Sequence, residues 1–173
     1  GGAAAVFRRA AVQAVGGFEE RFFCYGEDVD LGFRLRLAGG RAVQVSGARV
    51  LHEGSGITGR TSDFTIYHGH RNRIWTTYRC MPGMMFWLLL PARLAADLYL
   101  LARSPFSRTF RPYWRALRDG YGRLGEWRSE RRRLQNGRRV SSLALARMFE
   151  WSPLSLSRRK ASLRPIAAAA GEA

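Results

Sequence analysis

Apolar residues recur at helical spacing in several separate stretches of the chain. Residues 8–15 predict a short helix that ends at the glycine pair 16–17, because glycine is the usual residue just past a helix. Residues 27–38 predict a second helix, with apolar positions one turn apart and another glycine pair behind them. A third pattern of this period, from a Ser or Thr cap near residue 62 to residue 80, predicts a longer helix.

Short runs rich in small and branched residues lie between these helices. Residues 2–7 predict a strand of small residues. Residues 42–45 and 48–51 predict two brief strands or one strand with a bend, because Val-rich runs bounded by Gly and Ser favour extended backbone. Gly, Ser and Thr dominate residues 53–62, which predicts a flexible loop and a domain boundary. Strands that alternate with helices are typical of an α/β fold. We therefore expect residues 1–60 to belong to an α/β domain.

Residues 81–102 form the most apolar segment of the chain. Pro91, Arg93 and Asp97 interrupt it, and its longest run without glycine or a charged residue, residues 84–92, has nine residues. A helix needs about 20 apolar residues to cross a bilayer. We therefore expect this segment to lie on a membrane and not across it.

Residues 113–134 predict a further helix, in which aromatic residues and Leu alternate with many Arg. Such a helix suits a membrane interface, because its rings enter the headgroup layer while Arg meets lipid phosphates. A helix packed on its neighbour explains the same pattern. We assign residues 61–134 to a helical membrane-associated extension. Residues 135–173 are assigned to a basic tail, largely disordered apart from a short helix at 142–150.

Positive charge is concentrated in the second part of the chain. The net charge of the chain is +16. Residues 61–173 hold 21 of the 29 Lys and Arg residues and only seven of the 13 Asp and Glu residues, so most of the excess positive charge lies there. Such a surface attracts nucleic-acid phosphates, anionic lipid headgroups or a phosphorylated substrate. The preference for Arg fits phosphate binding, and it fits a GC-rich genome equally well. Cys24 and Cys80 lack the spacing of a disulfide framework or metal site, which favours a cytoplasmic location.

Two acids, Glu27 and Asp28, fall in the first turn of the helix predicted at 27–38. Backbone N–H groups and the helix dipole stabilise negative charge there. A carboxylate held in this way can act as a general base toward a hydroxyl group within about 3 Å. Phe23 and Tyr25 precede it and are placed to shape an acceptor pocket. Acids in a first turn are also common dipole partners without a function, and the pattern alone does not separate these roles.

Asp30 differs from these two acids. The string Asp28-Val29-Asp30 imitates an Asp-X-Asp metal motif, but a helix turns its two carboxylates about 200° apart. Arg34 follows Asp30 by one turn, which predicts a surface ion pair. We therefore assign Asp30 a structural role.

Two later residues are candidates for binding. His52 follows the strand predicted at 48–51 and precedes the Gly-rich loop, a place that often carries function in α/β folds. A structural histidine is the alternative, and as a metal ligand His52 would need carboxylates beside it. Arg71 shares a helix face with His68 and Asn72 and is placed to reach a phosphate, although such residues also cap or pair.

The motifs of residues 1–60, taken in order, resemble those of a known family. They are Gly-Gly-Phe-Glu-Glu-Arg-Phe-Phe from residue 16, Tyr-Gly-Glu-Asp-Val-Asp-Leu from 25, Arg-Leu-Arg-Leu-Ala-Gly-Gly from 34 and Ala-Arg-Val-Leu-His from 48. Together they resemble the C-terminal half of a family 2 glycosyltransferase of the GT-A fold, in the rhamnosyltransferase-like branch. The resemblance implies half of an α/β nucleotide-diphospho-sugar transferase domain, followed by a basic, partly amphipathic α-helical region.

The resemblance also implies an activity. Members of the family transfer a sugar, with inversion, from a nucleotide-sugar donor to a hydroxyl of a lipid-linked or polysaccharide acceptor. Asp28 matches the family's catalytic base and Glu27 its neighbour. His52 matches a position that in some members helps bind the divalent metal, Mn²⁺ or Mg²⁺. The candidate acceptor-binding residues are Phe23, Tyr25 and Arg71.

The nucleotide-binding half of the family has no counterpart in residues 1–173. We therefore expect this chain alone to bind no nucleotide sugar and to have no transferase activity. In an intact enzyme, the basic helices would hold it peripherally at the inner face of the cell membrane, on an anionic surface. The alternatives are an inactive remnant or split-enzyme module that needs a partner chain, and a basic nucleic-acid-binding protein. No recognised nucleic-acid-binding motif is present, so we expect no nucleic-acid partner.

Overall fold

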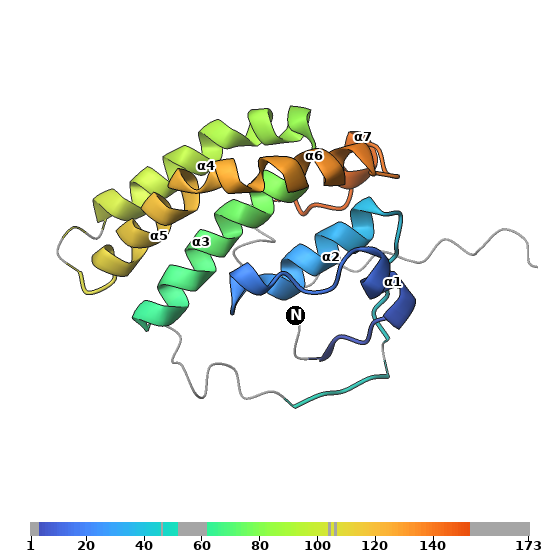
Figure 1. The fold of residues 1–173 in the computed structure, drawn as a ribbon. Coiled ribbons are helices and arrows are strands. Elements are labelled where there is room, and N and C mark those ends of the chain that lie inside the picture. The colour runs from blue at the N-terminus through green and yellow to red at the C-terminus, as the bar shows by residue number, and fades with distance from the viewer. Residues whose placement is uncertain (1–3, 46, 52–61, 104, 106, 153–173) are drawn as a thin grey trace, which may run out of the picture.

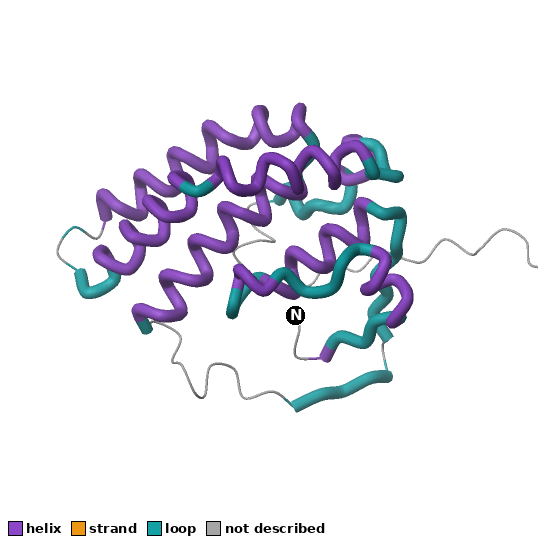
Figure 2. The backbone as a smooth tube through the Cα atoms, viewed as in Figure 1, coloured by secondary structure: helices purple, strands orange, loops and turns teal. Residues whose placement is uncertain are grey.

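The computed structural model describes residues 4–45, 47–51, 62–103, 105 and 107–152. Within these ranges all regular structure is helical (Figures 1 and 2). The elements are α1 (Arg9–Ala14), η2 (Glu20–Phe22), α2 (Glu27–Leu37), α3 (Asp63–Cys80), α4 (Gly83–Arg103), α5 (Phe110–Gly122), η3 (Leu124–Trp127), α6 (Arg128–Asn136) and α7 (Ser142–Ala146).

Local sequence signals fix the ends of the two helices that carry most of the candidate residues. Helix α2 begins directly after Gly26, whose φ of 87° is a left-handed conformation that favours glycine, and ends just before Gly39, with φ of 91°. The hydroxyl of Ser62 caps α3 by accepting a hydrogen bond from the N–H of Thr65 at 3.2 Å. The helices predicted at 27–38 and 62–80 are therefore confirmed.

Helix α3 is the centre of the structure, with α2 on one side and α4 and α5 on the other (Figure 1). Three apolar clusters fix this arrangement. The cluster of Phe22, Trp75 and Trp127 joins η2, α3 and η3. A second cluster joins α3 to α5. The third seals the far end of α3 against α2, α4 and α7, through Leu37, Cys80, Met81, Met85 and Leu145.

The predicted α/β fold is wrong for the described residues, in which no strand forms. Residues 4–7, 41–45 and 48–51 lack regular structure apart from one helical residue at position 4. A strand exists only through hydrogen bonds to a neighbouring strand, and no described segment pairs with them. The side chains of Val43 and Val45 are accordingly 57% and 67% exposed.

The helix predicted at 113–134 is divided in the structure. Helix α5 starts earlier, at Phe110, and the chain then passes through η3 before α6 continues to Asn136. The division falls among glycines, which are poor helix formers, and it lets the indole of Trp127 enter the core with 1% exposure. The short helix predicted at 142–150 is present as α7, but it ends at Ala146. The division of the chain at residues 60 and 134 stays a prediction.

Helix α4 corresponds to the apolar segment predicted at 81–102. Its 21 residues continue through Pro91, and only Met85 and Asp97 among them are buried. It is the one helix of the described ranges that is long and apolar enough to cross a membrane. Its position on a membrane, and not across it, stays a prediction.

Candidate active site

The loop before α2 has a strained backbone. Phe23 adopts φ 62° and ψ −62°, and the N–H of Cys24 donates to the carbonyl of Phe22 at 2.7 Å. This is the rare, strained form of the γ-turn. Tyr25, two residues later, also has positive φ, at 64°. Such conformations cost about 1–3 kcal/mol each and persist where surrounding contacts hold them, often at functional sites.

The side chain of Asn72 holds this loop from α3. It is fully buried, and its Nδ2 lies 2.9, 2.8 and 2.7 Å from the carbonyl oxygens of Phe22, Cys24 and Tyr25. The NH2 group of one side chain thus lies within hydrogen-bond distance of three carbonyl oxygens of the loop. The strained conformation is held because its carbonyl groups have this buried donor.

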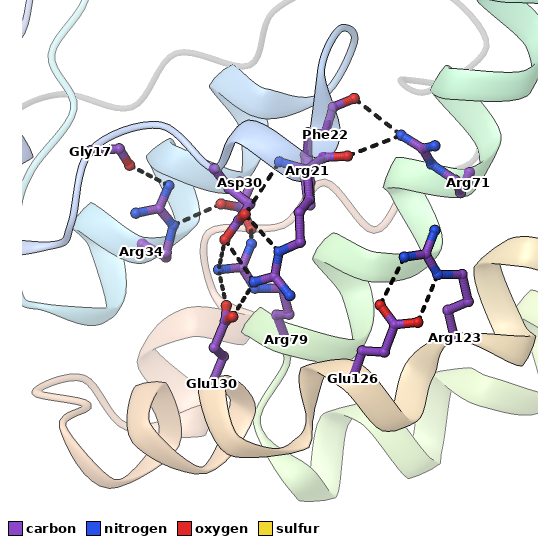
Figure 3. Close-up of polar contacts among 11 residues, drawn as sticks. Gly17, Arg21, Phe22, Asp30, Arg34, Arg71, Arg79, Arg123, Glu126 and Glu130 are labelled. Carbon is purple, nitrogen blue, oxygen red and sulfur yellow. Dashed lines mark hydrogen bonds and ion pairs between the residues drawn. The ribbon is translucent and has the colours of Figure 1, made fainter.

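Arg71 supports the same loop. Its Nη2 donates to the carbonyls of Arg21 and Phe22, both at 3.2 Å, as drawn in Figure 3. The guanidinium carbon lies 4.3 Å from the ring centroid of Trp75, and the residue is 7% exposed. Direct acceptor binding by Arg71 stays a prediction. Its contacts position the loop that carries the candidate aromatic residues.

Phe23 and Tyr25 meet the first turns of α3 in one aromatic surface. Phe23 is 76% exposed, and its ring lies 6.1 Å from Phe64 and 5.7 Å from His68. The Tyr25 ring also contacts Phe64, at 6.1 Å, and its hydroxyl accepts from Thr65 at 3.2 Å. Burial, followed by the charge of Arg71, lowers the pKa of His68, so this imidazole stays neutral to lower pH than usual.

Beside this aromatic surface lies a hollow of about 290 Å³ between α3 and α5. Phe64 and His68 belong to both features. From α5, the exposed side chains of Arg111 and Arg115 line the hollow, and Asp63 of α3 lines it as well. The two arginines outnumber this one carboxylate, which makes the hollow suitable for an anionic group. Phe64, Arg111 and Arg115 are not among the candidate residues predicted from the sequence. Only the four-residue spacing of the two arginines on one helix could have indicated them.

Glu27 and Asp28 occupy the first turn of α2, as predicted, and both are half-buried. Oδ1 of Asp28 accepts a hydrogen bond from the N–H of Val29 at 2.8 Å. Oε2 of Glu27 is removed from solvent and has no hydrogen-bond partner among the described residues. The helix terminus therefore presents two carboxylates directly after the aromatic loop.

Asp30 lies on the other side of α2. The prediction that it forms a surface ion pair is wrong about the surface. It is fully buried, and its Oδ2 lies 2.7 Å from Nε of Arg34, which confirms the ion pair itself. Its Oδ1 lies 3.0 Å from Nη1 of Arg79 on α3 (Figure 3). Arg79 also pairs with Glu130 of α6 at 2.8 Å. A buried network, and not a surface pair, holds α2 against α3 and α6.

The metal prediction finds no support in the described residues. His52 lies outside them, and they contain no group of three His, Cys, Asp or Glu side chains that could hold a metal ion. Asp28 and Asp30 point to different surroundings, as the helical spacing predicts. The described residues alone therefore do not fit a divalent cation.

Residues 2–170 match the family described as glycosyl transferase family group 2. The chain belongs to this family. It is 52% identical, over 117 residues, to the N-acetylglucosaminyl-diphospho-decaprenol L-rhamnosyltransferase of two Mycobacterium tuberculosis strains. The match covers 64% of this chain and 37% of the relative.

A second relative is an O-antigen biosynthesis protein of Myxococcus xanthus. It is 42% identical over 53 residues, which are 31% of this chain and 4% of that protein. No solved structure matches the chain. The glycosyltransferase chain thus spans well under half the length of each of these relatives.

Proposed function

We propose that this chain serves the transfer of a sugar from a nucleotide-sugar donor to a hydroxyl of a lipid-linked acceptor in cell-surface glycan synthesis, with Asp28 as general base. The observation that carries the proposal is the position of Asp28, in a helix first turn directly after a strained, exposed aromatic loop. The name of the M. tuberculosis relative supports the acceptor class and suggests L-rhamnose as the sugar.

The chemistry assigned to Asp28 is a single proton transfer coupled to displacement. Its carboxylate accepts the proton of the acceptor hydroxyl, and the freed electron pair of that oxygen forms the new bond to the anomeric carbon. The bond from that carbon to the nucleoside diphosphate breaks, and the diphosphate leaves with the electron pair. Attack opposite the leaving group inverts the anomeric centre, so one base suffices. Glu27 adds negative charge beside the base.

The acceptor is assigned to the surface formed by the loop and α3. The exposed ring of Phe23, with Phe64 and Tyr25, offers apolar faces for a sugar ring. Arg111 and Arg115 line the adjoining hollow and suit the diphosphate of a lipid-linked sugar. Arg71 acts through the loop in this scheme and is a positioning residue.

Membrane association is the second part of the proposal. The apolar side chains of α4 are exposed over most of its length, and the chain carries a net charge of +16. Such a helix, with Arg around it, suits the anionic inner face of a cell membrane, where a lipid-linked acceptor would be located. We propose that α4 lies in this interface and that the protein is peripheral.

A chimera provides the test. The 117 residues of this chain that match the M. tuberculosis relative replace the corresponding segment of that protein. Transfer of L-rhamnose to N-acetylglucosaminyl-diphospho-decaprenol is then measured. We expect the chimera to be active, and Asp28→Asn to reduce kcat about 10² to 10⁴-fold, the usual effect of removing a general base. Glu20→Gln, at an exposed carboxylate eight residues earlier, is the matched control. A folded but inactive chimera, or an Asp28→Asn chimera that keeps a tenth of the activity, would contradict the assignment.

Donor binding is tested on the chain itself. We expect no calorimetric signal with UDP-, GDP- or dTDP-sugars in the presence of Mn²⁺, because the described residues supply neither a sheet nor a metal site for a nucleotide. Micromolar binding of any of these donors would show that the chain carries a donor site of its own.

A further inference from the structure

A groove of about 530 Å³ lies between α3, α4 and the segment that joins α5 to α6. It is separate from the aromatic loop, because it is lined by the later residues of α3, from Ile74 to Tyr78. Its walls are mainly apolar and aromatic, and include Ile74, Tyr78, Phe86, Trp87, Leu90 and Leu94. A volume of this size accepts a single small ligand or part of a lipid.

Three arginines, Arg93, Arg128 and Arg131, line the same groove, and none of its described lining residues is acidic. Arg93 bonds through Nε to Asp97 at 2.9 Å, but its Nη2 is buried and has no partner among the described residues. A buried guanidinium nitrogen without an acceptor is costly, and an anionic oxygen would satisfy it.

Asp97 makes no hydrogen bond to Nη2 of Arg93, although both of its oxygens are acceptors. It accepts hydrogen bonds from Tyr113 at 2.8 Å and from Tyr121 at 2.6 Å, in addition to Arg93. Burial raises the pKa of Asp97, but these hydrogen bonds outweigh it, so the pKa lies below its usual value and the carboxylate stays charged. Asp97 therefore fixes Arg93 in place in the lining of the groove.

The groove is continuous with the exposed apolar face of α4. Trp87 lines the groove and is 68% exposed, while its neighbours Met84 and Leu88 are 71% and 73% exposed. If this face enters a lipid layer, Trp87 lies at the boundary, where an indole ring is favoured. The arginines of the groove then lie at the depth of the lipid phosphates.

We propose that this groove binds one anionic phospholipid of the bilayer. Its phosphate meets Arg93 and Arg128, and one acyl chain follows Trp87, Leu90 and Leu94. The bound lipid fixes the orientation of α4, and with it the orientation of the whole helical body, on the membrane. The inference rests on the proposed membrane position of α4, and it is independent of the role of Asp28.

Short-chain phosphatidylglycerol, kept below its micelle concentration, tests the groove without a bilayer. Titrated into the full chain, it should give saturable binding at one site, with a blue shift of tryptophan emission that Trp87→Phe removes. Arg128→Gln, at an exposed position that leaves the Arg93–Asp97 pair intact, should weaken binding about tenfold, the effect of one charge-assisted hydrogen bond. The matched control is Arg132→Gln, an exposed arginine of α6 outside the groove lining, which should stay within about twofold.

Four results would overturn the proposal. Equal weakening by Arg128→Gln and Arg132→Gln would show general charge attraction. Equal affinity for short-chain phosphatidylcholine would show that the groove does not select anionic lipid. Saturation by inorganic phosphate in the same concentration range would show a phosphate site that needs no acyl chain, and displacement of the lipid by single-stranded DNA would favour a nucleic-acid surface. None of these readouts depends on transferase activity, so failure here is distinguishable from failure of the proposed function.

Discussion

Nη1 of Arg79 lies 3.0 Å from Oδ1 of Asp30, and both side chains are almost completely removed from solvent. The two residues lie 49 positions apart, on α3 and α2. Glu130 of α6 completes the network by pairing with Arg79 at 2.8 Å. The orientation of α2, and therefore the position of Asp28 two residues earlier, depends on this buried pair.

Removing the charge of Asp30 should be strongly destabilising. Asp30→Asn leaves buried Arg34 beside a neutral amide and removes one carboxylate from Arg79, which keeps Glu130. An uncompensated buried charge costs about 3–5 kcal/mol. The free energy of unfolding in urea measures the effect. Glu126→Gln, which breaks the exposed pair with Arg123, is the control and should change the free energy of unfolding far less. Similar losses in the two variants would show that the buried network contributes no more than a surface pair.

The Asp30 network also shows how far sequence reasoning extends. The pairing with Arg34 is predictable, because a spacing of four residues places both side chains on one helix face. The burial of the pair and the contact with Arg79 are not predictable, because they depend on α3 packing against α2. Asp30 and Arg34 thus have the structural role predicted for them, but they have it in the core and not at the surface.

The limits of α2 and α3 were predicted well and strands were not, for a physical reason. Caps and glycines act within a few residues, so Ser62 and Gly26 mark helix starts by themselves. A strand depends on a distant partner, and the Val-rich runs near 43 and 50 have none among the described residues. In the candidate site, the positive φ of Phe23 had no sequence signal, since a phenylalanine rarely adopts it.

The contact between α3 and α5 predicts opposite effects for two glycines of α5. A Cβ added at Gly120 would lie 2.6 Å from Cδ1 and 3.3 Å from Cβ of Ile74, whereas one at Gly122 meets nothing within 4 Å. Gly120→Ala should therefore lower the free energy of unfolding by about 1–3 kcal/mol through overpacking. Gly122→Ala should raise it by up to about 1 kcal/mol through helix propensity. Urea denaturation of both variants checks the contact, and equal effects would contradict it.

His70 should make the stability depend on pH. Burial, followed by the charges of Arg73 and Arg93, lowers the pKa of His70 to about 4, although nearby Asp97 opposes the shift. The ring also packs edge-on against Tyr113, at 4.5 Å. The unfolded chain binds the proton below about pH 6.5 and the folded chain does not until about pH 4. Stability from the neutral imidazole is therefore present above pH 6.5 and lost as pH falls toward 4.

The measurement compares wild type with His70→Gln. Between pH 7 and pH 5, wild type should lose on the order of 1–2 kcal/mol more than the variant, a value that allows for the partial exposure of the site. Carboxylates and His68 titrate in both proteins and cancel in the difference. An identical pH dependence of the two urea midpoints would show that His70 is protonated as readily in the folded chain as in the unfolded chain.

The strain at Phe23 gives a prediction in which glycine is more stable than alanine. In an ordinary exposed loop, Gly is less stable than Ala because it has more freedom in the unfolded chain. At φ 62° and ψ −62°, only Gly has no Cβ to strain. Phe23→Gly and Phe23→Ala both remove the contacts with Phe64 and His68, so their difference isolates the backbone. We expect the Gly variant to be the more stable by about 1 kcal/mol.

The same two variants separate strain from function. In the chimera, both should raise the KM for the lipid-linked acceptor by a similar factor, because both lack the exposed ring that is assigned to the acceptor sugar. Stability would then distinguish the two variants, while acceptor binding would not. If Phe23→Ala were as stable as Phe23→Gly, the left-handed turn would not be strained. If neither changed KM, the ring would have no part in acceptor binding, and the buried donors of Asn72 and Arg71 would hold the loop for another purpose.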